Sequence, residues 1–271
     1  MSLVFGAIAP HGGDILAEIA DDPTVMARTR AAMEEMGRRC RARRPETIVV
    51  LTPHGIVVDN AISIGATPLA AGSLGEAPRE IRARYATDLL LVEAIGEACA
   101  AQEVPLVRLV GDEGATADLP LDWGALIPLW YAANPRDSLP EVVVLAPDRS
   151  LPREKLVRCG LAIARAAETT GRAVALIASC DQGHAHDANG PYGYNPASAL
   201  HDKAMCDVLR SDTLDTLLAW PQAFLEDGKV DAYWQTIMLA GALGHTPMRG
   251  ELLSYEAPTY FGMAVAVYEP T

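Results

Sequence analysis

The strongest constraint on this chain is a short pattern that occurs twice within its first 55 residues. Two largely apolar runs, residues 5–9 and 47–52, are each followed by Pro-His-Gly, which places His11 and His54 in equivalent positions. The runs are typical of buried strands, and proline and glycine end a strand and turn the backbone. Because ligands bind at the carboxyl edge of an open α/β sheet, we predict that the two imidazoles meet there.

Strand-like and helix-like segments alternate along the chain. Further strands are expected at residues 61–66, 104–110, 141–146, 173–179, 249–255 and 262–267, and helices at 23–43, 87–102, 121–131, 152–170, 197–209, 213–219 and 232–243. Residues 68–84 are rich in glycine, alanine and proline, which predicts a loop. The alternation predicts an α/β fold with one domain over residues 1–271, in which helices flank a central mixed sheet and the metal site lies at strand ends.

Composition narrows the class of protein. With 22 basic and 35 acidic residues, the net charge of −13 disfavours nucleic acid and anionic membranes as partners. No apolar run approaches the roughly 20 residues of a membrane span. The five cysteines are scattered without a Cys-x-x-Cys motif, and no signal-peptide pattern is present, so we expect reduced thiols and a cytoplasmic location.

The histidines point to a metal site with open coordination positions. Two histidines and one carboxylate suit a non-haem Fe(II) ion, and zinc could occupy the same ligands. His11 and His54 are the expected imidazoles. The spacing of residues does not decide which carboxylate is the third ligand, because several acidic residues lie in predicted turns. The candidates are Glu256, Asp14, Glu76, Asp181 and Asp187.

Two more histidines, His184 and His186, follow the strand expected at residues 173–179. They are two residues apart, so they do not share one face unless the turn bends. Since imidazole titrates near neutrality, one of them could serve as a general base.

The ordered set of short motifs resembles a known family. It comprises residues 9–12, 52–55, 121–124 with 128–129, 179–184, 193–196 and 254–258. The set is similar to the class III extradiol ring-cleavage dioxygenase superfamily, of the protocatechuate 4,5-dioxygenase catalytic-subunit type, and the resemblance spans nearly the whole chain.

The resemblance implies an iron-dependent oxidoreductase of aromatic compound catabolism that opens the ring of a catechol or aminophenol with O2. It assigns Fe(II) to His11, His54 and Glu256, and it makes His184 the catalytic acid/base. It also implies a homo-oligomer or an assembly with a second subunit.

One position departs from the family pattern. Relatives commonly have Asp-His-Gly where this chain has Asp122-Trp123-Gly124. We expect Trp123 to line the substrate pocket, with His186 as a partial substitute for the missing imidazole. Two alternatives to a dioxygenase follow: a Memo-like metal-binding protein without ring cleavage, and a zinc hydrolase on the same fold.

Overall fold

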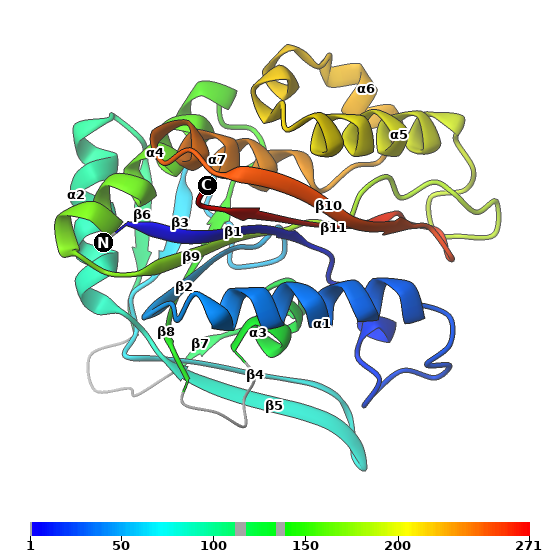
Figure 1. The fold of residues 1–271 in the computed structure, drawn as a ribbon, viewed down its shortest axis with the longest axis horizontal. Helices are drawn as coiled ribbons and strands as arrows, with labels where there is room; N and C mark the ends of the chain where they lie inside the picture. Colours follow the sequence, from blue (N-terminus) through cyan, green and yellow to red (C-terminus); the bar gives the residue numbers. More distant parts are fainter. Residues whose placement is uncertain (1, 112–117, 134–138) are drawn as a thin grey trace.

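The computed structural model describes residues 2–111, 118–133 and 139–271. Eight strands form one mixed sheet in the order β10-β11-β1-β9-β2-β8-β3-β6 (Figure 1). Their bounds are β1 Leu3–Ala9, β2 Thr47–Leu51, β3 Ile62–Gly65, β6 Leu106–Leu109, β8 Glu141–Pro147, β9 Val174–Ser179, β10 Arg249–Glu256 and β11 Met263–Glu269. The predicted α/β class with a central mixed sheet is confirmed.

The centre of this sheet fixes where the two Pro-His-Gly turns lie. Strands β1, β9, β2 and β8 are mutually parallel, so they end at the same edge. Every residue of β2 and β9 is buried, which explains their continuous apolar sequence. Strand β9 lies between β1 and β2, and the residues that follow it therefore lie between the two histidine turns.

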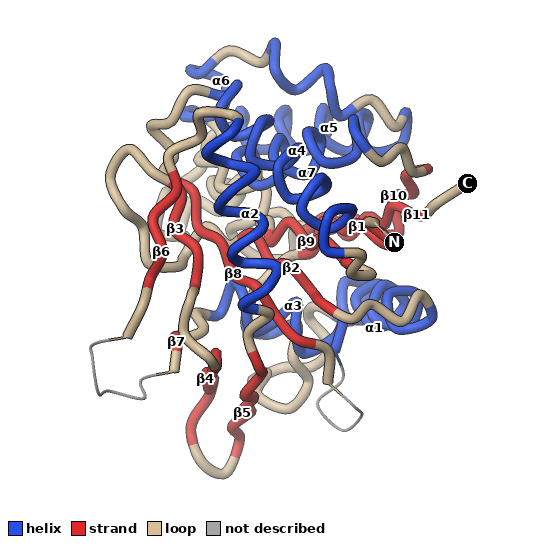
Figure 2. Tube along the Cα trace, turned by 90° about the vertical axis from the view of Figure 1, so that its left-hand side faces the viewer, coloured by secondary structure: helices blue, strands red, loops and turns tan. Residues whose placement is uncertain are grey.

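Helices cover both faces of the sheet. Helices α2, α4, α5, α6 and α7 lie on one face, and α1 and α3 lie on the other (Figures 1 and 2). Their bounds are α1 Ala27–Ala42, α2 Leu89–Ala101, α3 Trp123–Ala133, α4 Arg153–Thr170, α5 Pro196–Ser211, α6 Gln222–Asp227 and α7 Tyr233–His245. The 3-10 turns are η1 Gly13–Ile15 and η2 Leu214–Ala219. Each face packs its own apolar cluster against the sheet.

The structure corrects three predictions about secondary structure. The loop expected at residues 68–84 is wrong, because β4 (Leu69–Glu76) and β5 (Arg79–Ala86) form a hairpin that pairs with β7 (Leu119–Pro120) in a second sheet. Alternation of buried and solvent-facing residues along β5 is the strand signal that composition concealed. The helix expected at residues 213–219 is the 3-10 turn η2, and helix α6 was not predicted.

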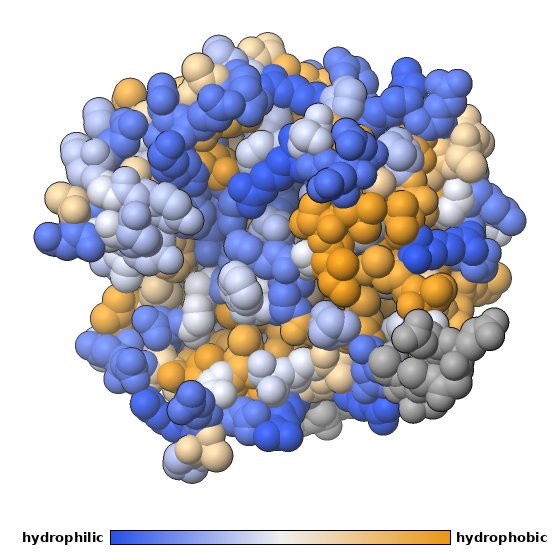
Figure 3. Space-filling view, turned by 180° about the vertical axis from the view of Figure 1, so that it is seen from behind, coloured by the Kyte–Doolittle hydropathy of each residue, from blue (hydrophilic) through white to orange (hydrophobic). Residues whose placement is uncertain are grey.

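The surface is mostly hydrophilic on the face shown in Figure 3, where an apolar patch borders a hydrophilic hollow. Within the described ranges, no helix combines the length and apolarity that crossing a bilayer requires.

Candidate metal centre and active-site pocket

Three ligand atoms converge at the edge where the parallel strands end. The Nε2 atoms of His11 and His54 lie 3.0 Å apart. Oδ2 of Asp231 lies 3.5 Å from each of these nitrogens. In the described part of the chain, these three residues form the cluster able to hold a metal ion. The convergence of His11 and His54 agrees with the sequence prediction, whereas Asp231 was not among its candidates.

The spacing fits one ion bound by all three atoms. Ligands about 2.1 Å from a common metal are roughly 3.0–3.4 Å apart at octahedral or tetrahedral angles. The observed separation of 3.0 Å matches the lower end of this range, and the two separations of 3.5 Å lie just above its upper end. Two imidazoles and a carboxylate on one side of an ion leave positions open for other ligands.

A hydrogen-bonded chain fixes which nitrogen of His11 faces the site. The Ser179 hydroxyl donates to the Gly124 carbonyl at 2.5 Å, so its oxygen accepts from Nδ1–H of His11 at 2.9 Å. Nε2 of His11 is then the nitrogen that faces His54 and Asp231 and that would bind a metal ion. This arrangement orients a ligating imidazole before any metal binds.

The charges at the site favour a cation. Burial lowers the pKa of His11, but the nearby carboxylates of Asp181 and Asp231 outweigh burial and raise this pKa to about 9. Burial opposes ionisation of Asp231, yet the imidazoles of His11 and His54 hold its pKa well below the usual range. Oδ2 of Asp231 is buried and has no hydrogen-bond partner among the described residues. A buried, ionised and unpartnered oxygen beside two imidazoles fits a metal ligand.

The turn that carries His54 packs against the start of helix α3. The backbone N–H of His54 donates to the Thr52 hydroxyl at 3.2 Å, and this hydroxyl donates to Asp122 at 2.7 Å. A Cβ atom at Gly124 would lie 2.6 Å from the same hydroxyl oxygen, so this position has no room for a side chain. The Trp123 ring stacks on His54, with centroids 4.3 Å apart.

Glu256 does not meet the two imidazoles, which corrects its assignment as the metal carboxylate. Its Oε1 accepts the backbone N–H of Thr29 at 2.8 Å and the Thr29 hydroxyl at 2.6 Å. Thr29 lies in the first turn of α1, whose N-cap residue Met26 makes no side-chain cap. Glu256 therefore caps a helix from another element, where a negative charge suits the helix dipole.

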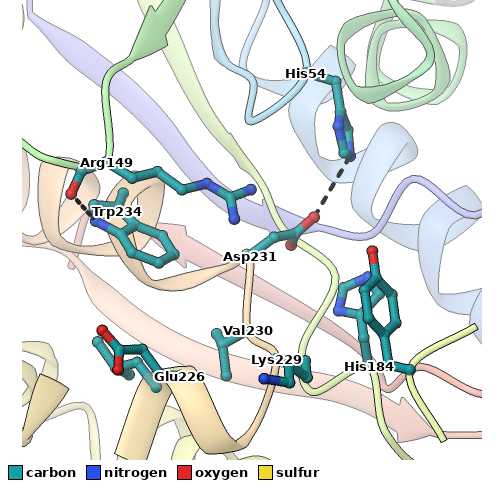
Figure 4. A pocket seen from close by; sticks show the side chains of 10 residues that line it. His54, Arg149, His184, Glu226, Lys229, Val230, Asp231 and Trp234 are labelled. Atoms are coloured by element: carbon teal, nitrogen blue, oxygen red, sulfur yellow. Dashed lines mark hydrogen bonds and ion pairs between the residues drawn. The ribbon is translucent and has the colours of Figure 1, made fainter. Parts of the chain in front are cut away.

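His184 shares a pocket with the metal centre. The pocket has a volume of about 340 Å³, and His54, Asp231 and His184 face it together (Figure 4). Nδ1–H of His184 donates to the Gln182 carbonyl at 2.9 Å, which leaves Nε2 to accept or deliver a proton. The ring stacks on Phe261, with centroids 5.7 Å apart.

The two residues expected to line the pocket lie elsewhere. Nε2 of His186 donates to the buried carboxylate of Asp202 at 2.8 Å, and His186 is absent from the pocket wall. This corrects His186 as a substitute for the missing imidazole. Trp123 is also absent from that wall; it covers His54 and is 47 % exposed.

Trp123 is expected to support metal binding through His54. Stacked aromatic rings contribute about 0.5–1.5 kcal/mol beyond their buried area, so Trp123→Leu should weaken metal binding roughly two- to tenfold. Titration with Co(II), read by absorbance, measures the affinity. Trp220→Leu is the control, because Trp220 packs against His201 and Phe224. Equal affinities in wild type and Trp123→Leu would show that the stacking does not support the ligand.

Comparison with known proteins identifies the family of the chain. The catalytic LigB subunit of aromatic ring-opening dioxygenase is the family whose model matches residues 6–267. Protein CA_C1420 of Clostridium acetobutylicum is 24% identical over 99% of this chain, and the chain spans 58% of that relative's length. The crystal structure of the uncharacterized protein JW3007 from Escherichia coli K12 has the same fold, with a TM-score of 0.64, 16% identity and coverage of 97% of this chain and 99% of that one. Since the family model covers nearly the whole chain, this protein belongs to the LigB family.

Proposed function

We propose that the chain is a non-haem Fe(II)-dependent extradiol dioxygenase that opens the ring of a catechol or an aminophenol. The observation that carries the proposal is the convergence of His11, His54 and Asp231 in a pocket that also contains His184. Two imidazoles and one carboxylate suit Fe(II) with open positions. Bound there, the metal would supply a shared site for the substrate hydroxyls and O2.

The protein residues around that site have separate tasks. His11 and His54 present their Nε2 atoms 3.0 Å apart, and Asp231 would supply a negative charge that offsets part of the metal's charge. His184 presents Nε2 to the same pocket and would take the proton from a substrate hydroxyl and return it later. Phe261 and Tyr260 pack beside this imidazole and limit the directions in which its ring can point.

The test is anaerobic reconstitution with Fe(II), followed by oxygen uptake against a panel of catechols and aminophenols. The proposal expects uptake that is equimolar with ring opening for at least one substrate. Tight metal binding without uptake across the panel would favour a Memo-like protein. Hydrolysis by the zinc-loaded protein without oxygen uptake would favour a zinc hydrolase. Light scattering of the same preparation would distinguish a homo-oligomer from a chain that needs a second subunit.

Two cationic side chains on the pocket wall predict a preference for anionic rings. The Arg149 guanidinium lies 4.8 Å from the Trp234 ring centroid, and the indole N–H donates to the Arg149 carbonyl at 2.9 Å. Figure 4 shows that this guanidinium points toward Asp231. Arg149 and Lys229 both line the pocket, and neither pairs with a carboxylate within the described ranges. A carboxylate on the ring would therefore find a positioned cation.

Arg149→Met is expected to lower kcat/KM for a carboxylated catechol by about tenfold, because a hydrogen bond to a charged group contributes about 1.5–3 kcal/mol and solvent weakens it here. The value for unsubstituted catechol should not change. Arg165→Met removes the same charge from an exposed position of α4 and serves as the control. Equal losses on both catechols would show that Arg149 does not recognise the substituent.

A further inference from the structure

His184 lies on an irregular segment that needs support from elsewhere in the fold. Between β9 and α5 the chain makes only isolated bridges in the described structure, at Asp181 with Met263 and at His186 with Tyr194. Loops are less precise supports than helices or strands for a group that must be held within about 0.5 Å. The position of His184 therefore depends on contacts with other elements.

The backbone around His184 is anchored at four successive residues. The N–H of Gly183 donates to Oδ1 of Asp202 at 2.7 Å, and that of His184 donates to the Gly228 carbonyl at 3.1 Å. The next two N–H groups, of residues 185 and 186, donate to the Ser198 hydroxyl at 2.9 Å and the Tyr260 carbonyl at 3.1 Å. Asp202 and Ser198 lie on α5, so this helix holds the segment on both sides of His184.

Asp202 makes a second contact with the same segment. Its Oδ2 accepts Nε2–H of His186 at 2.8 Å and the Tyr255 hydroxyl at 2.8 Å, while Oδ1 also accepts from His201 at 2.9 Å. The side chain is 1 % exposed. One buried carboxylate thus binds Gly183 on one side of His184 and His186 on the other.

Two glycines leave space for this carboxylate. A Cβ atom at Gly262 would lie 1.9 Å from Oδ2 of Asp202, and a Cβ atom at Gly183 would lie 3.0 Å from Oδ1. The Gly262 N–H donates to the Gly183 carbonyl at 3.0 Å, which ties the start of β11 to the same place. The local sequence is therefore shaped to bring Asp202 against the segment that carries His184.

We infer that Asp202 is a positioning residue that holds His184 toward the metal centre. His186 supports this role by donating a hydrogen bond from its ring to the Asp202 carboxylate. This inference rests on the proposed function, in which His184 moves the substrate proton. Asp202 does not line the pocket, and its hydrogen bonds within the described structure go to none of the metal ligands, so its effect on turnover would pass through the segment that carries His184. Loss of this support should let the His184 ring sample other directions without changing the metal ligands.

The first test uses Asp202→Asn, with Asp207→Asn as the matched control on the exposed side of α5. Because a small misplacement costs up to about a hundredfold in rate, Asp202→Asn should lower kcat roughly ten- to a hundredfold and leave Co(II) affinity unchanged. In a His184→Ala background, the same substitution should cause no further loss. An equal loss in both backgrounds would overturn the inference.

A second readout does not need activity. Long-range ¹H–¹⁵N spectra of protein labelled at histidine should show His184 as a single Nδ1–H tautomer in the wild type. In Asp202→Asn the His184 signals should broaden or move toward a tautomer average, while His245, paired with Glu168 at the surface, should not change. Unchanged His184 signals in the folded variant would overturn the inference. If the wild type showed no turnover, the proposed function would fail and these spectra would still decide the role of Asp202.

If Asp202→Asn does not fold, substitutions of His186 provide a milder pair of variants. His186→Leu removes the ring N–H donor, whereas His186→Gln keeps a side-chain N–H that can reach Asp202. The leucine variant should show the broadened His184 signals and the lower kcat, and the glutamine variant should restore both. Identical behaviour of the two variants would contradict a role for the bond to Asp202.

Discussion

Replacing Asp231 with asparagine is expected to weaken metal binding by at least about a hundredfold and to abolish turnover. This loss should exceed the roughly 10–100-fold effect of an outer-shell partner, because Asp231 supplies the carboxylate of the cluster. Asparagine keeps an acceptor for the Asp181 N–H, which donates to Oδ1 of Asp231 at 3.1 Å, so the loop should retain its fold. Competition between the protein and a calibrated chelator for Co(II) measures the affinity.

Glu256→Gln is the matched control for this prediction. The amide oxygen of the introduced glutamine can still accept from Thr29. The lost charge at the start of α1 should cost about 0.3–1 kcal/mol of stability without changing metal affinity. If Glu256→Gln lost the metal while Asp231→Asn kept it, the family-based assignment of Glu256 would be right and the geometry would be misleading.

His184→Ala is expected to keep the metal and lose most turnover. General acid–base catalysis contributes typically about 10²–10⁴-fold, and His184 shares the pocket with the metal centre without belonging to the cluster of ligands. The measurement is kcat of the Fe(II)-loaded variant together with its metal content. His245→Ala, on the surface beside Glu168, is the control. Lost metal in a folded His184→Ala variant would make His184 a ligand, and unchanged kcat would remove it from the chemistry.

The Pro-His-Gly repeat was enough to predict that His11 and His54 meet. Two apolar strands with the same ending place their histidines at the same sheet edge, whatever strand lies between them. The insertion of β9 between β1 and β2 is a matter of topology, and short-range patterns do not encode it. That insertion brings Ser179 within hydrogen-bond distance of His11, which explains why the His11 imidazole has a fixed orientation.

The carboxylate could not be found in the same way. Asp231 lies in the turn before α7, two residues ahead of Tyr233, so a search of strand ends passes over it. Glu256 satisfied the strand-end criterion and the apparent motif, yet its side chain reaches Thr29 in α1. The distinction depends on which side of the sheet edge each side chain faces, and only tertiary structure supplies that information.

The spacing of His184 and His186 does not by itself determine the direction or the role of either ring. Residues two apart share a face in regular extended backbone, yet here the two rings diverge, one toward the pocket and the other toward Asp202, because the segment after β9 is an irregular turn. The role of His186 depends on the carboxylate of Asp202, 16 residues later in the chain. This carboxylate reaches His186 only because α5 packs against the segment that carries it.

The central claim is that His11, His54 and Asp231 together hold the metal. Anomalous diffraction from metal-loaded crystals, collected at the absorption edge of the bound ion, tests this claim most directly. One strong peak is expected about 2.0–2.2 Å from Nε2 of His11, Nε2 of His54 and the Asp231 carboxylate, with His184 beyond bonding distance. A peak bonded to Glu256, or one that leaves Asp231 uncoordinated, would contradict it.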